Sequence, residues 1–368
     1  MNRIVVPLLL FSFVIFFFFG LFVGIYKFFP YHELDELKTQ LEPKNIKLDN
    51  KTHDTLNLSD MISIQDKNDI IQKRYQLTQF IWNSDEIPKK LPDIVENNFY
   101  DERFDDLSNL KHIDKLIIEM EYGVSSTVYM FVPETNNGKL ILYHQGHSGG
   151  FINGKYIIQK FLNNGFSVAA FSMPLLGLNN QPIVEIEKIG PVKFFKHDQL
   201  IYLENNNFSS MSYFFTPLAA TLNYIDKNYS FDEYTMVGIS GGGWASTVYP
   251  ALDTRISKSF AVAGSLPLSL RNTSNDVGDY EQYRLDFYSI ANYFELYLMS
   301  AYGETREFIQ IFNKYDPCCF AGNISISYAD SIKDRLSELG TGNFEVIIDD
   351  THYEHKISDT VIELILNN

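Results

Sequence analysis

The sequence predicts an α/β fold, in which a mostly parallel twisted sheet is flanked by helices and preceded by one transmembrane helix. The fold is indicated by the alternation, from about residue 112 onward, of short apolar β-branched runs with amphipathic helical stretches. The transmembrane helix is indicated by residues 4–26, which carry no charged side chain. Two intervals, 172–215 and 266–305, are each about forty residues long and interrupt the alternation. Long excursions of this kind usually form a lid or a pocket wall.

The apolar run from Ile4 to Tyr26 would span about 34 Å as a helix, which is enough to cross a bilayer. No small-residue cleavage site precedes Lys27, so an uncleaved signal anchor is expected rather than a signal peptide. Arg3 precedes the run and acidic residues follow Lys27, which favours an extracytoplasmic position for the rest of the chain. The predicted organisation is an anchor (1–27), a polar stalk (28–65) and a catalytic domain (66–368) that opens with a helical extension (66–111).

Composition excludes several classes of protein. The 368 residues carry a net charge of −16, and so acidic a chain would be repelled by the phosphates of a nucleic acid. The only two cysteines, Cys318 and Cys319, are adjacent and are not expected to form a disulfide. The eight histidines include no zinc-binding spacing, so neither a metal nor a cofactor is expected.

The predicted strands begin with a hairpin and continue as buried apolar runs. Lys115–Tyr122 and Ser126–Val132 flank the turn-forming Gly123, and β-branched and aromatic residues dominate both. Runs that are apolar throughout are typical of parallel strands buried on both faces. These runs are Leu140–Tyr143, Phe166–Phe171, Tyr234–Val237, Ser259–Ala263, Phe308–Phe312 and Phe344–Ile348.

The predicted helices are recognised by apolar spacing and by their capping residues. Thr216 is the expected N-cap of a helix that has Pro217 in its first turn. Ser358 is the expected cap of the last helix. The other expected helices are 66–82, Tyr156–Asn163, one that begins near Trp244, and Ser331–Leu339, which Gly340 closes.

A candidate nucleophile lies in Gly238-Ile239-Ser240-Gly241-Gly242, which has the form G-x-S-x-G. The motif follows a predicted strand and precedes a predicted helix, the context in which such a serine stands exposed on a sharp turn. The backbone N–H of Gly241 would face a developing oxyanion at the helix N-terminus.

With this motif, residues 112–368 resemble the serine hydrolases of the α/β-hydrolase superfamily, in the style of its acetyl-xylan esterase, dienelactone hydrolase and prolyl-oligopeptidase-like branches. The resemblance implies that an acid and a histidine follow the serine in the chain. Asp316, which precedes Pro317 after a predicted strand, fits the acid, with Asp349 and Asp350 as rivals. The base is expected after the last strand, where His355 is preferred to His352 because it lies three residues before the predicted cap.

The same resemblance implies a second oxyanion donor after the strand that ends at Tyr143. There, His144-Gln145-Gly146-His147 is similar to the His-Gly-x turn of the family, with one residue inserted. Alignment on Gly146 makes the N–H of His147 the donor, while Gln145 and Gly146 remain alternatives, and His144 would hold the loop. From the two long excursions, Lys196-His197-Asp198 and Asp279–Gln282 are candidates to face the site.

Together these residues predict a serine hydrolase that cleaves a carboxylic ester through an acyl-enzyme on Ser240. Acyl transfer and peptide cleavage are alternatives because the same triad serves water, an alcohol or an amine. A non-catalytic, membrane-tethered binding protein is a further alternative, since fold does not fix function. The expected substrate is a small-molecule, glycan or lipid ester, and the sequence selects neither among these nor an oligomeric state.

Overall fold

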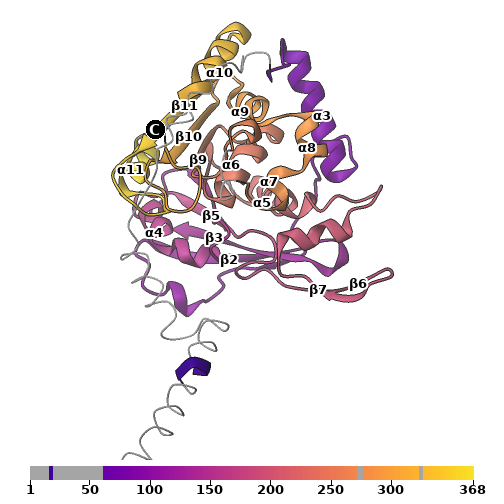
Figure 1. Cartoon of the computed structure of the whole chain (residues 1–368). Helices are drawn as coiled ribbons and strands as arrows, with labels where there is room; N and C mark the ends of the chain where they lie inside the picture. Colours follow the sequence, from indigo (N-terminus) through magenta and orange to yellow (C-terminus); the bar gives the residue numbers. More distant parts are fainter. Residues whose placement is uncertain (1–15, 20–60, 272–276, 323–325) are drawn as a thin grey trace, which may run out of the picture. The chain divides into compact units, whose positions relative to one another are not determined.

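The computed structural model describes residues 16–19, 61–271, 277–322 and 326–368 (Figure 1). By its contacts the chain divides into two units, 1–47 and 48–368. In the first unit only Phe16–Phe19 are described, as a helical segment with exposed side chains. Within the described ranges, no helix combines the length and apolar character needed to cross a bilayer. The predicted anchor therefore falls almost wholly outside the described residues.

The second unit is built on one nine-stranded sheet, which Figure 1 shows with helices on both faces. The strand order is β1-β2-β3-β5-β4-β8-β9-β10-β11. The pairs from β1 to β5 are antiparallel and the remaining pairs are parallel. The strands are β1 (Ile94–Glu96), β2 (Leu110–Glu119), β3 (Ser125–Pro133), β4 (Lys139–His144), β5 (Ser167–Phe171), β8 (Glu233–Ile239), β9 (Lys258–Val262), β10 (Glu307–Asn313) and β11 (Asn343–Asp349). The expected hairpin and strands are all present.

Alternate side chains of the central strands enter two separate cores, because successive residues of a strand point to opposite faces. In β4, Leu140 and Leu142 lie in one core, and Ile141 and Tyr143 lie in the other. The first core is covered by α3 (Lys67–Trp82), α5 (Ser212–Asn228), α6 (Gly241–Leu252), α8 (Leu285–Ile290), α9 (Tyr293–Ala301) and α10 (Ile326–Leu339). The second is covered by α4 (Lys155–Asn163) and α11 (Asp359–Asn367). The central strands are therefore buried on both faces, as the apolar runs predicted, whereas the predicted burial of Phe344–Ile348 is wrong, because β11 is an edge strand and is only partly buried.

Helix α5 begins at Ser212, one turn before the cap expected at Thr216. The hydroxyl of Thr216 does not cap the helix but accepts a 2.9 Å hydrogen bond from Trp82 Nε1. The added turn buries Tyr213, Phe214 and Phe215 in the core. Burial of these aromatics therefore outweighs the local capping signal, and Pro217 lies inside the helix.

Residues just before position 66, where the sequence predicted the catalytic domain to begin, also pack within the second unit. Ile62 and Ile64 are buried, and the backbone N–H of Ser63 donates to Glu295 Oε1 at 2.9 Å. Residues 61–65, which the sequence assigned to a polar stalk, thus lie against α9.

Arg306, just before β10, joins several elements through backbone carbonyls. Its guanidinium is buried and donates to Ile256 at 3.0 Å, Met299 at 3.1 Å, Tyr302 at 3.2 Å, and also Pro250. These carbonyls belong to the end of α6, the segment before β9 and the end of α9. The Arg306 side chain therefore links α6 and α9 to the strands β9 and β10 of the sheet.

We expect Arg306→Met to lower the free energy of unfolding by about 3 kcal/mol, because several buried carbonyls lose their donor. Urea unfolding of the purified protein measures this change. Arg335→Met is the matched control, since Arg335 pairs at 2.7 Å with the exposed Glu338 and such pairs contribute less than about 1 kcal/mol. Equal losses in the two variants would contradict this role for Arg306.

Candidate active site

Ser240 lies on the sharp turn between β8 and α6. Its φ is 58° and its ψ is −126°, a strained backbone conformation for a residue with a side chain. The turn is held from both sides, since Ser240 N–H donates to Val262 O at 2.9 Å and Ser240 O accepts from Trp244 N–H at 2.9 Å. Ser240 is partly exposed. The predicted nucleophile thus stands where the G-x-S-x-G motif places it, at the N-terminus of a helix.

The turn packs directly against the loop that follows β4. A Cβ on Gly242 would lie 1.9 Å from the carbonyl oxygen of His144, and one on Gly146 would lie 2.5 Å from Ser240 Cβ. Neither position has room for a side chain. The two backbone segments therefore touch because both carry glycine there.

This contact also narrows the choice of oxyanion donors. The N–H of Gln145 donates to Phe171 O at 3.0 Å, so it is not available to a substrate. The His147 ring lies on the turn, because a Cβ on Gly241 would be 2.4 Å from His147 Cε1.

His144 is buried, and its Nδ1 lies 2.9 Å from Gln145 O. Burial lowers the pKa of His144 to about 4, so this ring is neutral at physiological pH.

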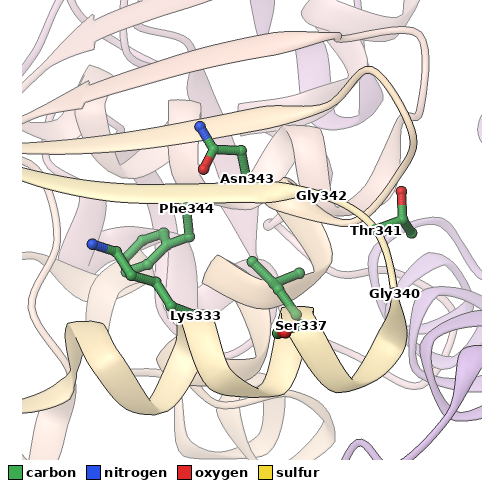
Figure 2. Close-up of a pocket in the computed structure, with 8 residues that line it drawn as sticks. Lys333, Ser337, Gly340, Thr341, Gly342, Asn343 and Phe344 are labelled. Carbon is green, nitrogen blue, oxygen red and sulfur yellow. The ribbon is translucent and has the colours of Figure 1, made fainter.

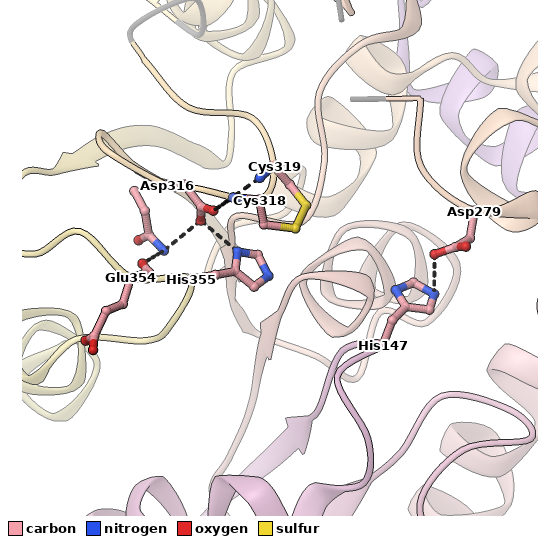
Figure 3. The surroundings of a disulfide bond; sticks show 8 residues. His147, Asp279, Asp316, Cys318, Cys319, Glu354 and His355 are labelled. Carbon is pink, nitrogen blue, oxygen red and sulfur yellow. Dashed lines mark hydrogen bonds and ion pairs between the residues drawn. A yellow bond between two sulfur atoms is a disulfide. The ribbon is translucent and has the colours of Figure 1, made fainter. Parts of the chain in front are cut away.

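Asp316 and His355 are brought together by the loops that follow β10 and β11 (Figure 3). His355 Nδ1 lies 2.7 Å from Asp316 Oδ2, and because a carboxylate only accepts, Nδ1 donates. His355 Nε2 is buried without a hydrogen-bond partner. Among the described residues no hydrogen bond joins it to Ser240 Oγ; such contacts often tighten only with substrate.

The Asp316 carboxylate accepts three further hydrogen bonds. Asn313 Nδ2 donates to Oδ2 at 3.2 Å, and the N–H groups of Cys318 and Cys319 donate to Oδ1 at 2.8 and 3.1 Å. A disulfide joins these two cysteines, contrary to the expectation from their adjacency, and Figure 3 shows it beside His355. The carboxylate is thus fixed on both oxygens while it orients the ring.

The alternative candidates for the base and the acid, which are His352, Asp349 and Asp350, interact with other groups. His352 Nδ1 accepts the N–H of Glu354 at 3.1 Å, and its Nε2, which is buried without a hydrogen-bond partner, lies 3.2 Å from the Asp349 carboxylate. Asp349 also accepts from Thr351 and from Ser358. His352 and Asp349 therefore form a polar network that holds the loop before α11. Asp350 lies 3.4 Å from the Lys314 ammonium.

Ser240, Asp316 and His355 share one edge of the sheet, because they follow the carboxyl ends of the parallel strands β8, β10 and β11. A surface pocket lined by Lys333, Ser337 and Gly340–Phe344 includes the first residues of β11 (Figure 2). It lies at the opposite edge, where strands begin, and lysine is its one titratable residue. That pocket is therefore separate from the candidate active site.

A polar cluster beside the site was not predicted as a set. His147 Nε2 lies 3.0 Å from Glu281 Oε1 and 3.2 Å from His197 Nδ1, and both partners are buried. Burial alone would raise the pKa of Glu281, but His197 and His147 outweigh it and hold that pKa well below its usual range. The excursions were expected to face the site, but no spacing in the sequence links positions 147, 197 and 281.

Comparison with known proteins identifies the fold of this chain. No family model and no curated protein matches the chain. Among solved structures, an acetyl xylan esterase from Paenibacillus sp. is 14% identical with a TM-score of 0.54, over 84% of this chain and 96% of that one. Acetyl xylan esterase 1 from Thermoanaerobacterium sp. is 15% identical with a TM-score of 0.53, over 81% and 92%. The chain therefore has the mixed α/β fold of these esterases, with a large, mostly parallel sheet.

We expect Gly242→Ala to disrupt the Ser240 turn, because its methyl group would have to displace the His144 carbonyl. The expected outcome is a loss of several kcal/mol in the free energy of unfolding, or insoluble protein. Ser246→Ala is the control on the same helix, since it removes a buried hydroxyl that has no partner and should change stability little. Thermal unfolding compares the two, and a Gly242→Ala protein as stable as the wild type would refute the close contact.

Proposed function

We propose that this protein is a serine hydrolase that cleaves a carboxylic ester through an acyl-enzyme on Ser240. The observation that carries the proposal is the 2.7 Å hydrogen bond from His355 Nδ1 to Asp316, which leaves Nε2 unpartnered at the sheet edge where Ser240 stands. The fold of the acetyl xylan esterases supports the same class of chemistry. The proposed substrate is accordingly an ester of a small molecule, glycan or lipid.

In the proposed mechanism His355 Nε2 removes the proton of the Ser240 hydroxyl as its oxygen attacks the ester carbonyl. The Asp316 carboxylate keeps the ring oriented and stabilises the imidazolium that forms. The developing oxyanion is bound by the N–H of Gly241 and by that of His147 or Gly146. His355 then gives its proton to the leaving alcohol, and a water molecule releases the acyl group by the same steps.

We expect a fluorophosphonate probe to label the purified full-length protein, and hydrolysis of p-nitrophenyl acetate to accompany labelling. Ser240→Ala and His355→Ala should each abolish labelling and lower kcat/KM by more than about 10⁴-fold. Asp316→Asn should lower kcat/KM by about 10³- to 10⁴-fold, because the amide favours the wrong tautomer of His355.

Two matched variants show whether these losses are specific. Ser246→Ala removes a buried serine of α6, the helix that follows Ser240, and His352→Gln removes the other histidine of the loop after β11. Both should retain labelling. Labelling lost in His352→Gln but kept in His355→Ala would reassign the base, and an unlabelled, folded wild type would overturn the hydrolase proposal in favour of a binding protein. Acyl product formed on an added alcohol or amine, in preference to hydrolysis, would favour transfer.

We further propose that residues 4–26 anchor the domain as a single-pass helix on the extracytoplasmic side. The support is the uncharged apolar run and the charges that flank it. The full-length chain should stay with the membrane after an alkaline wash and be cut by protease added to intact cells. A Phe13→Asp, Phe17→Asp, Leu21→Asp variant should move to the wash, since charges are costly inside a bilayer. Full-length protein recovered in the wash would refute the anchor.

A further inference from the structure

We propose that His147, His197 and Glu281, with Asp279 as a fourth ligand, bind a divalent transition-metal ion of the zinc class beside the Ser240 turn. The three first-named residues bring a ligand atom each to within 4.8 Å of one another. They come from the loop after β4, from the 3₁₀ helix at His197–Leu203, and from α7 (Tyr280–Tyr283). The cluster thus joins both long excursions to the loop after β4.

The distances between donors match a metal site. His147 Nε2 lies 3.0 Å from Glu281 Oε1, 3.2 Å from His197 Nδ1 and 3.1 Å from Asp279 Oδ2, and His197 Nδ1 lies 3.0 Å from Glu281 Oε2. In a tetrahedral zinc site with bonds of about 2.1 Å, neighbouring ligand atoms are roughly 3.4 Å apart. A shift of a few tenths of an ångström would therefore place one ion within reach of His147, His197 and Glu281. Asp279 lies 3.1 Å from His147 but outside this group of three, so it would complete the site by moving closer to the other two.

The ring of His197 is oriented for ligation through Nδ1. Its Nε2 lies 2.9 Å from the carbonyl oxygen of Pro174, which can only accept, so Nε2 carries a hydrogen. Without a metal, Nδ1 also carries a hydrogen, because it lies 3.0 Å from Glu281 Oε2, which only accepts. A bound ion would replace that hydrogen at Nδ1, since a metal ligand must be deprotonated. A metal-bound histidine usually donates its other N–H to a carbonyl or carboxylate in this way.

The donor set selects the kind of ion. Two imidazole nitrogens and carboxylate oxygens suit zinc and neighbouring transition metals, whereas calcium and magnesium prefer oxygen ligands alone. Glu281 is fully buried, while the Asp279 side chain is 48% exposed and lies on the open side. Figure 3 shows Asp279 in contact with His147, apart from Asp316 and His355. Ser240 is not a ligand, so the site does not depend on the proposed ester chemistry.

The test is a Zn²⁺ titration of the full-length, metal-stripped protein in detergent against a competing fluorescent chelator. One equivalent should bind, and His197→Asn and Glu281→Gln should each weaken binding by more than about 100-fold. Ser240→Ala should bind as the wild type does, which separates this site from the hydrolase proposal. His112→Asn is the control for the loss of a histidine beside a carboxylate, since His112 lies 3.7 Å from Asp114 on β2.

Two measurements keep the test decisive. If the buried variants fold poorly, Asp279→Asn replaces them, and it should weaken Zn²⁺ binding about tenfold without changing thermal unfolding of the metal-free protein. Because the disulfide leaves Cys318 and Cys319 without a thiolate, the competing cluster of these cysteines and His355 is tested on the reduced protein, whose Co²⁺ absorption should lack a thiolate charge-transfer band. Wild-type binding no tighter than that of His197→Asn, or a thiolate band, would overturn the proposal.

Discussion

The contact between the Ser240 turn and the loop after β4 is the constraint on which the candidate site depends. It is a backbone contact, possible only because Gly146 and Gly242 have no side chains. This contact brings the N–H of Gly241, at the start of α6, close to the loop that holds His147. One steric fit thus supports both the strained conformation of Ser240 and the proposed oxyanion site.

The position of His355 depends on the Asp316 carboxylate, which forms hydrogen bonds with residues of the loops after β10 and β11. Asn313, at the end of β10, donates to Asp316 and also to Lys356 O at 3.0 Å, so it links the two loops directly. The cysteine N–H groups hold the other oxygen. In the proposed mechanism, a carboxylate that is already oriented has less to reorganise when the imidazole of His355 becomes charged.

The sequence predicted the sheet, its flanking helices and the turn at Ser240, because each depends on local signals such as apolar runs, glycines and caps. It placed the start of α5 wrongly, since the aromatic burial that extends this helix is a tertiary effect. It also left Gln145 open as a donor, and only the pairing of its N–H with Phe171 removes that choice. The Cys318–Cys319 disulfide and the cluster around Glu281 depend on geometry that spacing does not encode.

The Glu281 cluster shows why the two excursions matter to the site. A buried carboxylate is costly unless it is paired, and Glu281 is paired with His197 from one excursion and with His147 from the loop after β4. A movement of either excursion would therefore break a buried charged contact unless the loop moved with it. Because that loop also packs on the Ser240 turn, the excursions are mechanically coupled to the proposed oxyanion site. An apolar wall of the same shape would give a weaker coupling, since the attraction between apolar side chains has no fixed direction.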